Sequence, residues 1–283
     1  IRDGNGDAFY ALAAYNGGWD QIHLRVTRNY ATDVLDHYAR AVAVEEMWRQ
    51  VANGEADVLA GAWLPRTHRE YYQEYGENLL DLGPILTGAR IGLVVPTVTP
   101  GRQTEGTGST ARQLVTVTSV EELEEKVSRF DGRIVGIESG AGVVARTREA
   151  LEAYDLSGLY YLVETDEEGM LRRVSDAVHR EEWVVFTGWK PHWMFELYNL
   201  RFLDDPQGIY GGSEAIHTMV RQGMEEELTD AVTVLERISY EPDDLERLMR
   251  WIHEDDRDEP YEQAIRWLQA HEERGDQWVA GVE

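Results

Sequence analysis

The sequence predicts an α/β fold, and two features of the chain support this prediction. Short apolar runs rich in β-branched residues have the length and composition of buried strands, and residues 91–96 and 184–187 are the clearest examples. Longer polar stretches with the apolar spacing of helices lie between these runs, so strands and helices alternate along the chain. At 283 residues the chain can form one large domain or two lobes of about 100 to 150 residues each.

The first elements surround a tryptophan. Residues 9–15 are expected to form a strand, and a glycine turn then leads to Trp19 at the start of a helix over residues 19–38. Residues 42–44 predict a second strand. The helix that follows places Met47 and Val51 on one apolar face, which indicates a core role for both.

Two later segments share one design, in which an apolar strand runs into a tryptophan and then a proline. The first begins at Ala56 and continues through Trp63 and Pro65. His68 follows five residues after the indole. Alone, a histidine at this place would be ordinary, and its proximity to Trp63 on the same loop is what makes it a candidate.

The second segment follows the strand predicted over residues 183–187. We expect this strand to end at Gly188, so that Trp189 lies where the backbone leaves the sheet and Pro191 prevents a return to it. Ligands of open α/β sheets bind at this edge. A strand of the core whose tryptophan only packs against it would give the same pattern. Because the pattern of strand, tryptophan and proline occurs twice, we favour the interpretation that Trp63 and Trp189 form two walls of one binding pocket.

The middle of the chain continues the alternation. Residues 97–112, rich in Thr, Gly and Gln, predict an exposed loop. Glycines within residues 139–143 precede a helix, where backbone N–H groups and the helix dipole favour an anion. In most proteins such a turn is only a tight connection. Further strands are expected over 91–96, 134–137 and 159–163, and residues 200–203 are expected to carry the chain back to the first lobe. Helices are expected over 69–75, 119–130, 146–154, 167–179, 213–222, 229–238, 243–253 and 261–271, with Trp251 and Trp267 as core residues.

The chain is strongly acidic. It contains 53 Asp and Glu against 27 Lys and Arg, a net charge of −26, which argues against nucleic acid or an anionic membrane surface as a partner. Lys126 and Lys190 are the only lysines. An acid excess with so little lysine favours a protein adapted to high salt, where screening relieves self-repulsion, over a merely acidic one.

Other classes of protein are excluded by composition. The sequence has no cysteine, hence no disulfide, thiolate metal site or cysteine nucleophile, and no apolar run is long enough to span a bilayer. The first residue is Ile1, so we expect a trimmed chain, and a removed signal peptide or lipoprotein leader would fit this expectation.

The two tryptophan segments, Ala62–His68 and Thr187–Phe195, together with Gly136–Val143, resemble the substrate-binding proteins of glycine betaine ABC transporters, the OpuAC/ProX-like family. The resemblance extends from about Ala11 to about Trp278 and includes residues 204–218. It implies a two-lobed periplasmic-binding-protein fold of type II with the ligand in the cleft between the lobes. Lobe 1 is expected in residues 1–96, lobe 2 in 97–200, and a return to lobe 1 with C-terminal helices in 201–283.

The resemblance also implies a binding site. Indoles suit a quaternary ammonium, which offers no N–H donor but attracts aromatic faces through cation–π contacts. The implied aromatic cage consists of Trp19, Trp63 and Trp189. The implied donors to the ligand carboxylate are His68 and the backbone N–H groups of Gly142 and Val143, and His192 and Trp193 are expected to buttress the second loop.

The implied function is the capture of glycine betaine outside the cytoplasmic membrane, by a monomer that delivers it to an ABC permease for osmoprotection. The chain is then periplasmic or otherwise extracytoplasmic, with or without a lipid anchor, and needs no cofactor or metal. Proline betaine, carnitine, choline and dimethylsulfoniopropionate are alternative ligands, and a sensory binding domain would use the same site. A carbohydrate-active enzyme is disfavoured, because neither tryptophan loop contains a carboxylate that could act as acid or base.

Overall fold

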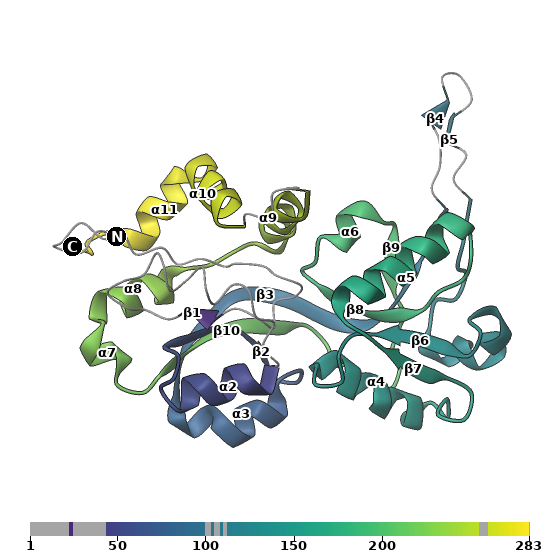
Figure 1. Ribbon diagram of the computed structural model, residues 1–283, viewed down its shortest axis with the longest axis horizontal. Coiled ribbons are helices and arrows are strands. Elements are labelled where there is room, and N and C mark those ends of the chain that lie inside the picture. Colours follow the sequence, from purple (N-terminus) through teal and green to yellow (C-terminus); the bar gives the residue numbers. More distant parts are fainter. Residues whose placement is uncertain are drawn as a thin grey trace. The chain divides into compact units, whose positions relative to one another are not determined.

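The computed structural model describes residues 23–24, 44–99, 103–104, 108–109, 112–254 and 260–282 (Figure 1). The chain divides into two compact units: unit 1 is Ile1–Ala89 with Ser213–Glu283, and unit 2 is Arg90–Gly212. Unit 1 is therefore interrupted in sequence by unit 2, and one long strand continues past the boundary at Ala89. The lobes expected over residues 1–96, 97–200 and 201–283 stay a prediction.

Unit 1 is built on an antiparallel sheet. Its strands, in spatial order, are β1 (His23–Leu24), β2 (Val58–Leu64), β10 (Glu214–Arg221) and the first part of β3 (Leu79–Pro96). β10 pairs with β2 on one side and with residues 79–89 of β3 on the other, so it is the central strand of this unit. Gly83 and Pro84 do not interrupt β3, because the pairing with β10 accommodates them through shifts in register.

β10 occupies residues for which the sequence predicted a helix, 213–222, and this prediction is wrong. The β-branched residues Ile216, Thr218 and Val220 alternate along the strand and all three are buried. This period of two, in residues that favour strands, fits a central position between two partners. The helix that was expected over residues 19–38 is also contradicted, at His23–Leu24, which pair with β2 as β1.

Two helices pack beside this sheet. They are α2 (Val44–Ala52) and α3 (Arg69–Tyr75), and Figure 1 shows both on the same side of β2 and β10. Met47, Trp48 and Val51 of α2 are fully buried in a core with Leu59 and Met219 of the sheet. The predicted core face of this helix is therefore confirmed, although Val44 begins the helix and does not end a strand.

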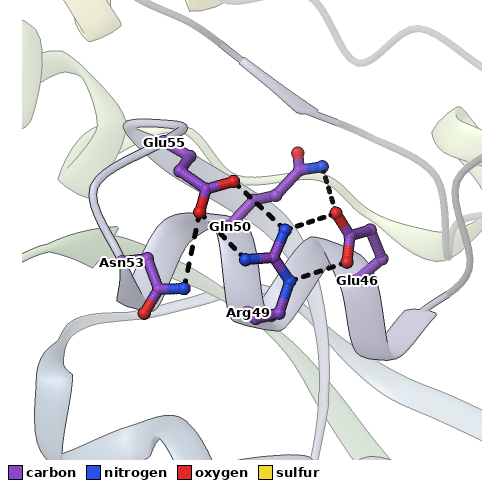
Figure 2. Close-up of polar contacts among 5 residues, drawn as sticks. All are labelled: Glu46, Arg49, Gln50, Asn53 and Glu55. Carbon is purple, nitrogen blue, oxygen red and sulfur yellow. Dashed lines mark hydrogen bonds and ion pairs between the residues drawn. The ribbon is translucent and has the colours of Figure 1, made fainter.

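Arg49, in the last turn of α2, forms ion pairs with Glu46 of the same helix and with Glu55 beyond its end (Figure 2). Arg49 donates from Nη2 to Glu46 Oε1 at 2.6 Å and from Nη1 to Glu55 Oε1 at 2.9 Å, and Gln50 donates to Glu46 at 2.7 Å. The hydrogen bond from Arg49 lowers the pKa of Glu55. This network ties the helix to the turn that leads into β2.

The C-terminal part of unit 1 is helical, as predicted. Tyr240, Trp267 and Trp278 form an aromatic cluster in which the two indoles stack at 6.2 Å, and Trp267 is buried as expected. The backbone N–H of Tyr240 donates to Ile85 O of β3 and so joins this cluster to the sheet. The helices are α7 (Met224–Glu227), α8 (Thr229–Arg237), α9 (Pro242–Glu254), α10 (Pro260–Ala270) and α11 (Glu272–Val279).

Unit 2 is built on a mixed sheet. β8 (Phe186–Lys190) lies between residues 90–96 of β3 and β6 (Arg133–Gly136), and β7 (Tyr161–Glu164) follows β6. Because β6 is parallel to both β7 and β8, each connection requires a crossover. The helices α4 (Gly142–Ala153) and α5 (Glu167–Arg180) make these crossovers in opposite directions, which places them on opposite faces of the sheet (Figure 1).

The remaining elements of unit 2 are short. β9 (Leu200–Phe202) pairs with the end of β3, so these residues do not yet carry the chain back to unit 1. The loop predicted over residues 97–112 contains the two-stranded hairpin β4 (Gln103–Thr104) and β5 (Gly108–Ser109). The 3₁₀ helices η2 (Gly76–Asn78, in unit 1) and η3 (Val120–Arg129) and the single-turn helix α6 (Met194–Leu197) complete the described elements.

Candidate functional site

The first tryptophan segment lies in unit 1, at the end of β2. Trp63 is 2% exposed and still belongs to the strand, opposite Ile216 of β10. The backbone then turns through Leu64–Pro65, a cis peptide bond, and returns to the indole residue. The N–H of His68 donates to Trp63 O at 2.9 Å, and the N–H of Trp63 donates to His68 Nδ1 at 3.1 Å.

This reciprocal pair fixes the state of the imidazole. A backbone N–H is always a donor, so Nδ1 of His68 must be the acceptor and the ring proton resides on Nε2. The ring is buried, at 1% exposure, with Trp48 edge-on at 6.0 Å and Tyr71 at 6.0 Å. Trp48 was predicted neither as a site residue nor as a partner of one, because nothing in its local sequence connects it to His68.

Glu214 holds the loop between Trp63 and His68. Its carboxylate is buried, accepts the backbone N–H of Arg66 at 2.6 Å and that of Thr67 at 2.9 Å, and also accepts the Thr67 hydroxyl. The first residue of β10 therefore supports a loop about 150 positions earlier in the chain. Sequence reasoning missed this role, because a helix was expected over residues 213–222 and nothing in the local sequence connects Glu214 to the loop.

The second tryptophan segment lies in unit 2. The strand that was expected to end at Gly188 continues as β8 to Lys190, and Trp189 pairs with Ile91 of β3. That prediction is wrong because the partner strand β3 runs on past this point and keeps its ladder bonds. Lys190–Pro191 is a cis peptide bond, as in the first segment.

Gly188 is required where it stands. A Cβ there would lie 2.6 Å from Cγ2 of Val94, closer than real Cβ atoms approach, and 3.2 Å from Cε of Met194, which is a tight contact. The strand before Trp189 therefore packs against its neighbours in a way that only glycine allows.

Histidine again follows the tryptophan. His192 is fully buried, and its ring stands perpendicular to that of Trp189 with the centroids 4.9 Å apart. Its Nδ1 accepts the N–H of Met194 at 3.0 Å, and its Nε2 lies 3.1 Å from Oε1 of Glu167 on α5. The Trp193 ring also contacts the imidazole, with the two ring centroids 5.2 Å apart. His192 therefore lies against Trp189 and Trp193 against His192. The buttressing role expected of His192 and Trp193 stays a prediction.

The N-terminus of α4 contains the two predicted amide donors. Gly142 and Val143 are its first residues and are buried, and the N-cap is Ala141, whose side chain has no acceptor for the amides of the first turn. The Val143 carbonyl accepts the Thr147 hydroxyl at 2.8 Å, and Thr147 in turn accepts the hydroxyl of Tyr210 at 3.1 Å. A helix N-terminus of this kind favours negative charge.

Asp205 organises the segment that supports α4. It accepts the hydroxyl of Tyr154 at 2.5 Å and the N–H of Tyr210 at 2.7 Å. Burial raises the pKa of Tyr154 to about 12, and the hydrogen bond to Asp205 acts in the same direction. Burial also raises the pKa of Tyr210. Both phenols therefore remain protonated donors at neutral pH.

The structure places most of the predicted site residues in two groups. Trp63 and His68 meet in unit 1 through direct hydrogen bonds, and Trp189, His192 and Trp193 meet in unit 2. Gly142 and Val143 also belong to unit 2. Trp19 lies outside the described residues, so its part in the site stays a prediction.

Comparison with known proteins identifies the family. The family described as "Substrate binding domain of ABC-type glycine betaine transport system" matches residues 31–270, most of the chain. This chain belongs to that family. The resemblance drawn from the two tryptophan segments is thereby confirmed, and so is the predicted α/β fold of the type II periplasmic binding proteins.

Individual relatives agree with this assignment. The glycine betaine/carnitine transport binding protein GbuC of Listeria monocytogenes is 34% identical over 151 residues, which span 53% of this chain and only about half, 50%, of that protein. Three solved structures superpose well. ProX of Borrelia burgdorferi, a glycine betaine/L-proline-binding protein, has a TM-score of 0.76 at 32% identity. The match covers 85% of this chain and 84% of the ProX chain.

The other two structures contain ligands. Lactococcal OpuAC, in its closed form with glycine betaine, has a TM-score of 0.75 at 34% identity over 88% of this chain and 91% of its own. An ABC-transporter choline-binding protein in complex with choline has a TM-score of 0.72 at 25% identity, and the match covers 86% of this chain and 81% of that protein. This chain is therefore similar to a solved structure that contains glycine betaine and to one that contains choline.

Family membership establishes the general role. The chain is a substrate-binding protein of the glycine betaine/choline type, from a family of extracytoplasmic solute-binding proteins and not of enzymes. None of the helices within the described ranges is both long and apolar enough to cross a bilayer.

Proposed function

We propose that this protein, as a monomer, captures glycine betaine outside the cytoplasmic membrane and delivers it to an ABC permease for osmoprotection. The observation that carries the proposal is the common design of the two tryptophan segments. Each holds a buried indole near the end of a strand and fixes a histidine through a backbone N–H to Nδ1. Membership in the glycine betaine family and the likeness to OpuAC complexed with glycine betaine support the ligand.

The proposed cage suits the cationic end of the ligand. A trimethylammonium group has no N–H to donate, so it is held by shape and by the negative faces of aromatic rings. Each indole contact with a desolvated cation contributes about 0.5 to 2 kcal/mol. We assign these contacts to Trp63 of unit 1, to Trp189 of unit 2 and to Trp19.

The proposed donors suit the carboxylate end. His68 carries its proton on Nε2 because Nδ1 accepts the Trp63 N–H, so the imidazole is a neutral donor without any change of protonation. Gly142 and Val143 add backbone N–H groups and the positive end of the α4 dipole. These donors distinguish a betaine, which has a carboxylate, from choline, which has none.

Other methylated ligands share the ammonium group. Carnitine and choline appear in the names of relatives, and proline betaine and dimethylsulfoniopropionate have similar shapes. Choline is the second candidate, and the sharpest test of it is His68, whose loss would harm a betaine site and hardly affect a choline site. A sensory role would use the same pocket with a different partner protein.

Calorimetric titration of the purified protein with glycine betaine and with choline tests the proposal. The variants are Trp189→Ala and His68→Ala, with Trp183→Ala as a control tryptophan of unit 2 that is outside the segment. Because the net charge of −26 favours a high-salt environment, each titration is run at low and at high NaCl.

We expect glycine betaine to bind more tightly than choline, and Trp189→Ala to weaken both by at least about tenfold, since it removes one cation–π wall and its packing area. His68→Ala should weaken glycine betaine selectively, and Trp183→Ala should change neither. A folded wild-type protein that binds neither ligand would refute the proposal. Equal effects of His68→Ala on both ligands would refute the carboxylate assignment.

A further inference from the structure

Glu167 is a buried carboxylate of unit 2 to which the function proposed above assigns no role. Its side chain is 7% exposed, and it is the first residue of the 14-residue helix α5. Asp166 caps this helix by accepting the N–H of Gly169 at 2.7 Å. The positive end of the helix dipole lies in this first turn, where it stabilises negative charge.

Glu167 is joined to Trp189 by a single side chain, His192. Nε2 of His192 lies 3.1 Å from Oε1 of Glu167, and the imidazole stands perpendicular to the Trp189 indole at 4.9 Å between centroids. Since Nδ1 accepts the Met194 N–H, the imidazole has its proton on Nε2, donates it to the carboxylate and is itself neutral. The pair therefore retains the carboxylate charge and does not cancel it.

We propose that Glu167 is a specificity-determining residue. Its negative charge, held beside Trp189 through His192, favours a ligand with a quaternary ammonium head group over one of the same shape whose head group is uncharged. This inference rests on the proposed function, because it takes Trp189 as a wall of the cation site.

In this arrangement Trp189 provides the shape of the site, and Glu167 behind it provides the negative charge. A carboxylate in direct contact with the ligand would attract small hydrated cations, whereas one behind an aromatic wall acts only through its field. At an effective dielectric constant of about 20, a unit charge about 10 Å away changes the binding constant of a monovalent cation by roughly tenfold. Buried charges are screened much less by salt than exposed ones, so the effect persists at high ionic strength.

Two ligands that differ only in the charge of the head group serve as probes. One is glycine betaine, and the other is 3,3-dimethylbutanoate, in which a quaternary carbon replaces the quaternary nitrogen while the carboxylate and all methyl groups remain. The ratio of the two dissociation constants measures the preference for positive charge. Loss of packing in the pocket weakens both ligands and leaves this ratio unchanged.

The decisive variant is Glu167→Gln, which retains an acceptor for His192 Nε2–H and removes the charge. The matched control is Glu168→Gln, which removes the same charge one residue along α5 from an exposed side chain paired with Arg172. Glu167→Asp retains the charge. Should Glu167→Gln fail to fold, Glu167→Met provides an uncharged side chain of similar volume.

We expect the wild-type preference for glycine betaine to fall roughly tenfold in Glu167→Gln, by less than twofold in Glu168→Gln, and to be largely retained in Glu167→Asp. A preference unchanged in the folded uncharged variant would overturn the inference and leave the proposed function intact. Wild-type protein that binds no glycine betaine would overturn the proposed function itself, and the inference with it.

Discussion

The loop between Trp63 and His68 depends on one distant carboxylate, and its removal can be evaluated from the structure. Glu214→Ala deletes the acceptor of two backbone N–H groups, from Arg66 and Thr67, and of one hydroxyl. Hydrogen bonds to charged groups contribute about 1.5 to 3 kcal/mol each, but Arg66 is exposed and water can replace part of the loss. We therefore expect the free energy of unfolding to fall by about 2 to 4 kcal/mol in total.

Urea denaturation followed by circular dichroism, at constant high salt, measures this loss. Glu226→Ala is the control, because Glu226 is exposed on the neighbouring helix α7 and its removal should cost less than about 0.5 kcal/mol. Glycine betaine affinity should fall in parallel, since the loop holds His68 in place. A loss below about 1 kcal/mol for Glu214→Ala would show that the loop keeps its structure without this carboxylate, and would refute the reasoning.

Two further predictions concern unit 2. Gly188→Ala should lower the free energy of unfolding by about 1 to 3 kcal/mol, because its Cβ would lie 2.6 Å from Val94 Cγ2. Gly158→Ala is the control, since a Cβ there meets nothing within 4 Å. Equal losses of stability for the two variants in urea titrations would contradict the prediction. Stability should also fall as the pH rises from about 10, the ordinary tyrosine pKa, through about 12, that of folded Tyr154, because the folded state holds this proton more tightly. Tyr154→Phe should flatten that part of the pH profile, and an equally steep profile would argue against the assignment.

Contiguous sequence was sufficient to recognise the two tryptophan segments. Trp63, Pro65 and His68 lie within six positions, and the hydrogen bonds between Trp63 and His68 are local. A motif of this kind carries its own geometry, because short-range backbone turns decide which groups meet. The family could be identified from these segments for the same reason.

The central strand of unit 1 could not be predicted in the same way. Residues 213–222 precede a helical region and contain good helix formers such as Glu214, Ala215 and Met219, so local preference suggested a helix. Long-range pairing with β2 and β3 decided for β10, and its alternating β-branched residues reveal this only once both partners are known. Likewise, β8 includes Gly188 and Trp189 because β3 continues beside them.

The sequence by itself determined the α/β class, the family, and the identity of the residues proposed for the site. Only the tertiary structure revealed the groups that hold these residues: Trp48 against His68, Glu214 under the first loop and Glu167 behind His192. These partners are far from the site residues in sequence. The local sequence around a buried acid or indole does not predict which residue it contacts. Their positions follow from how the strands pair, which is a property of the whole chain.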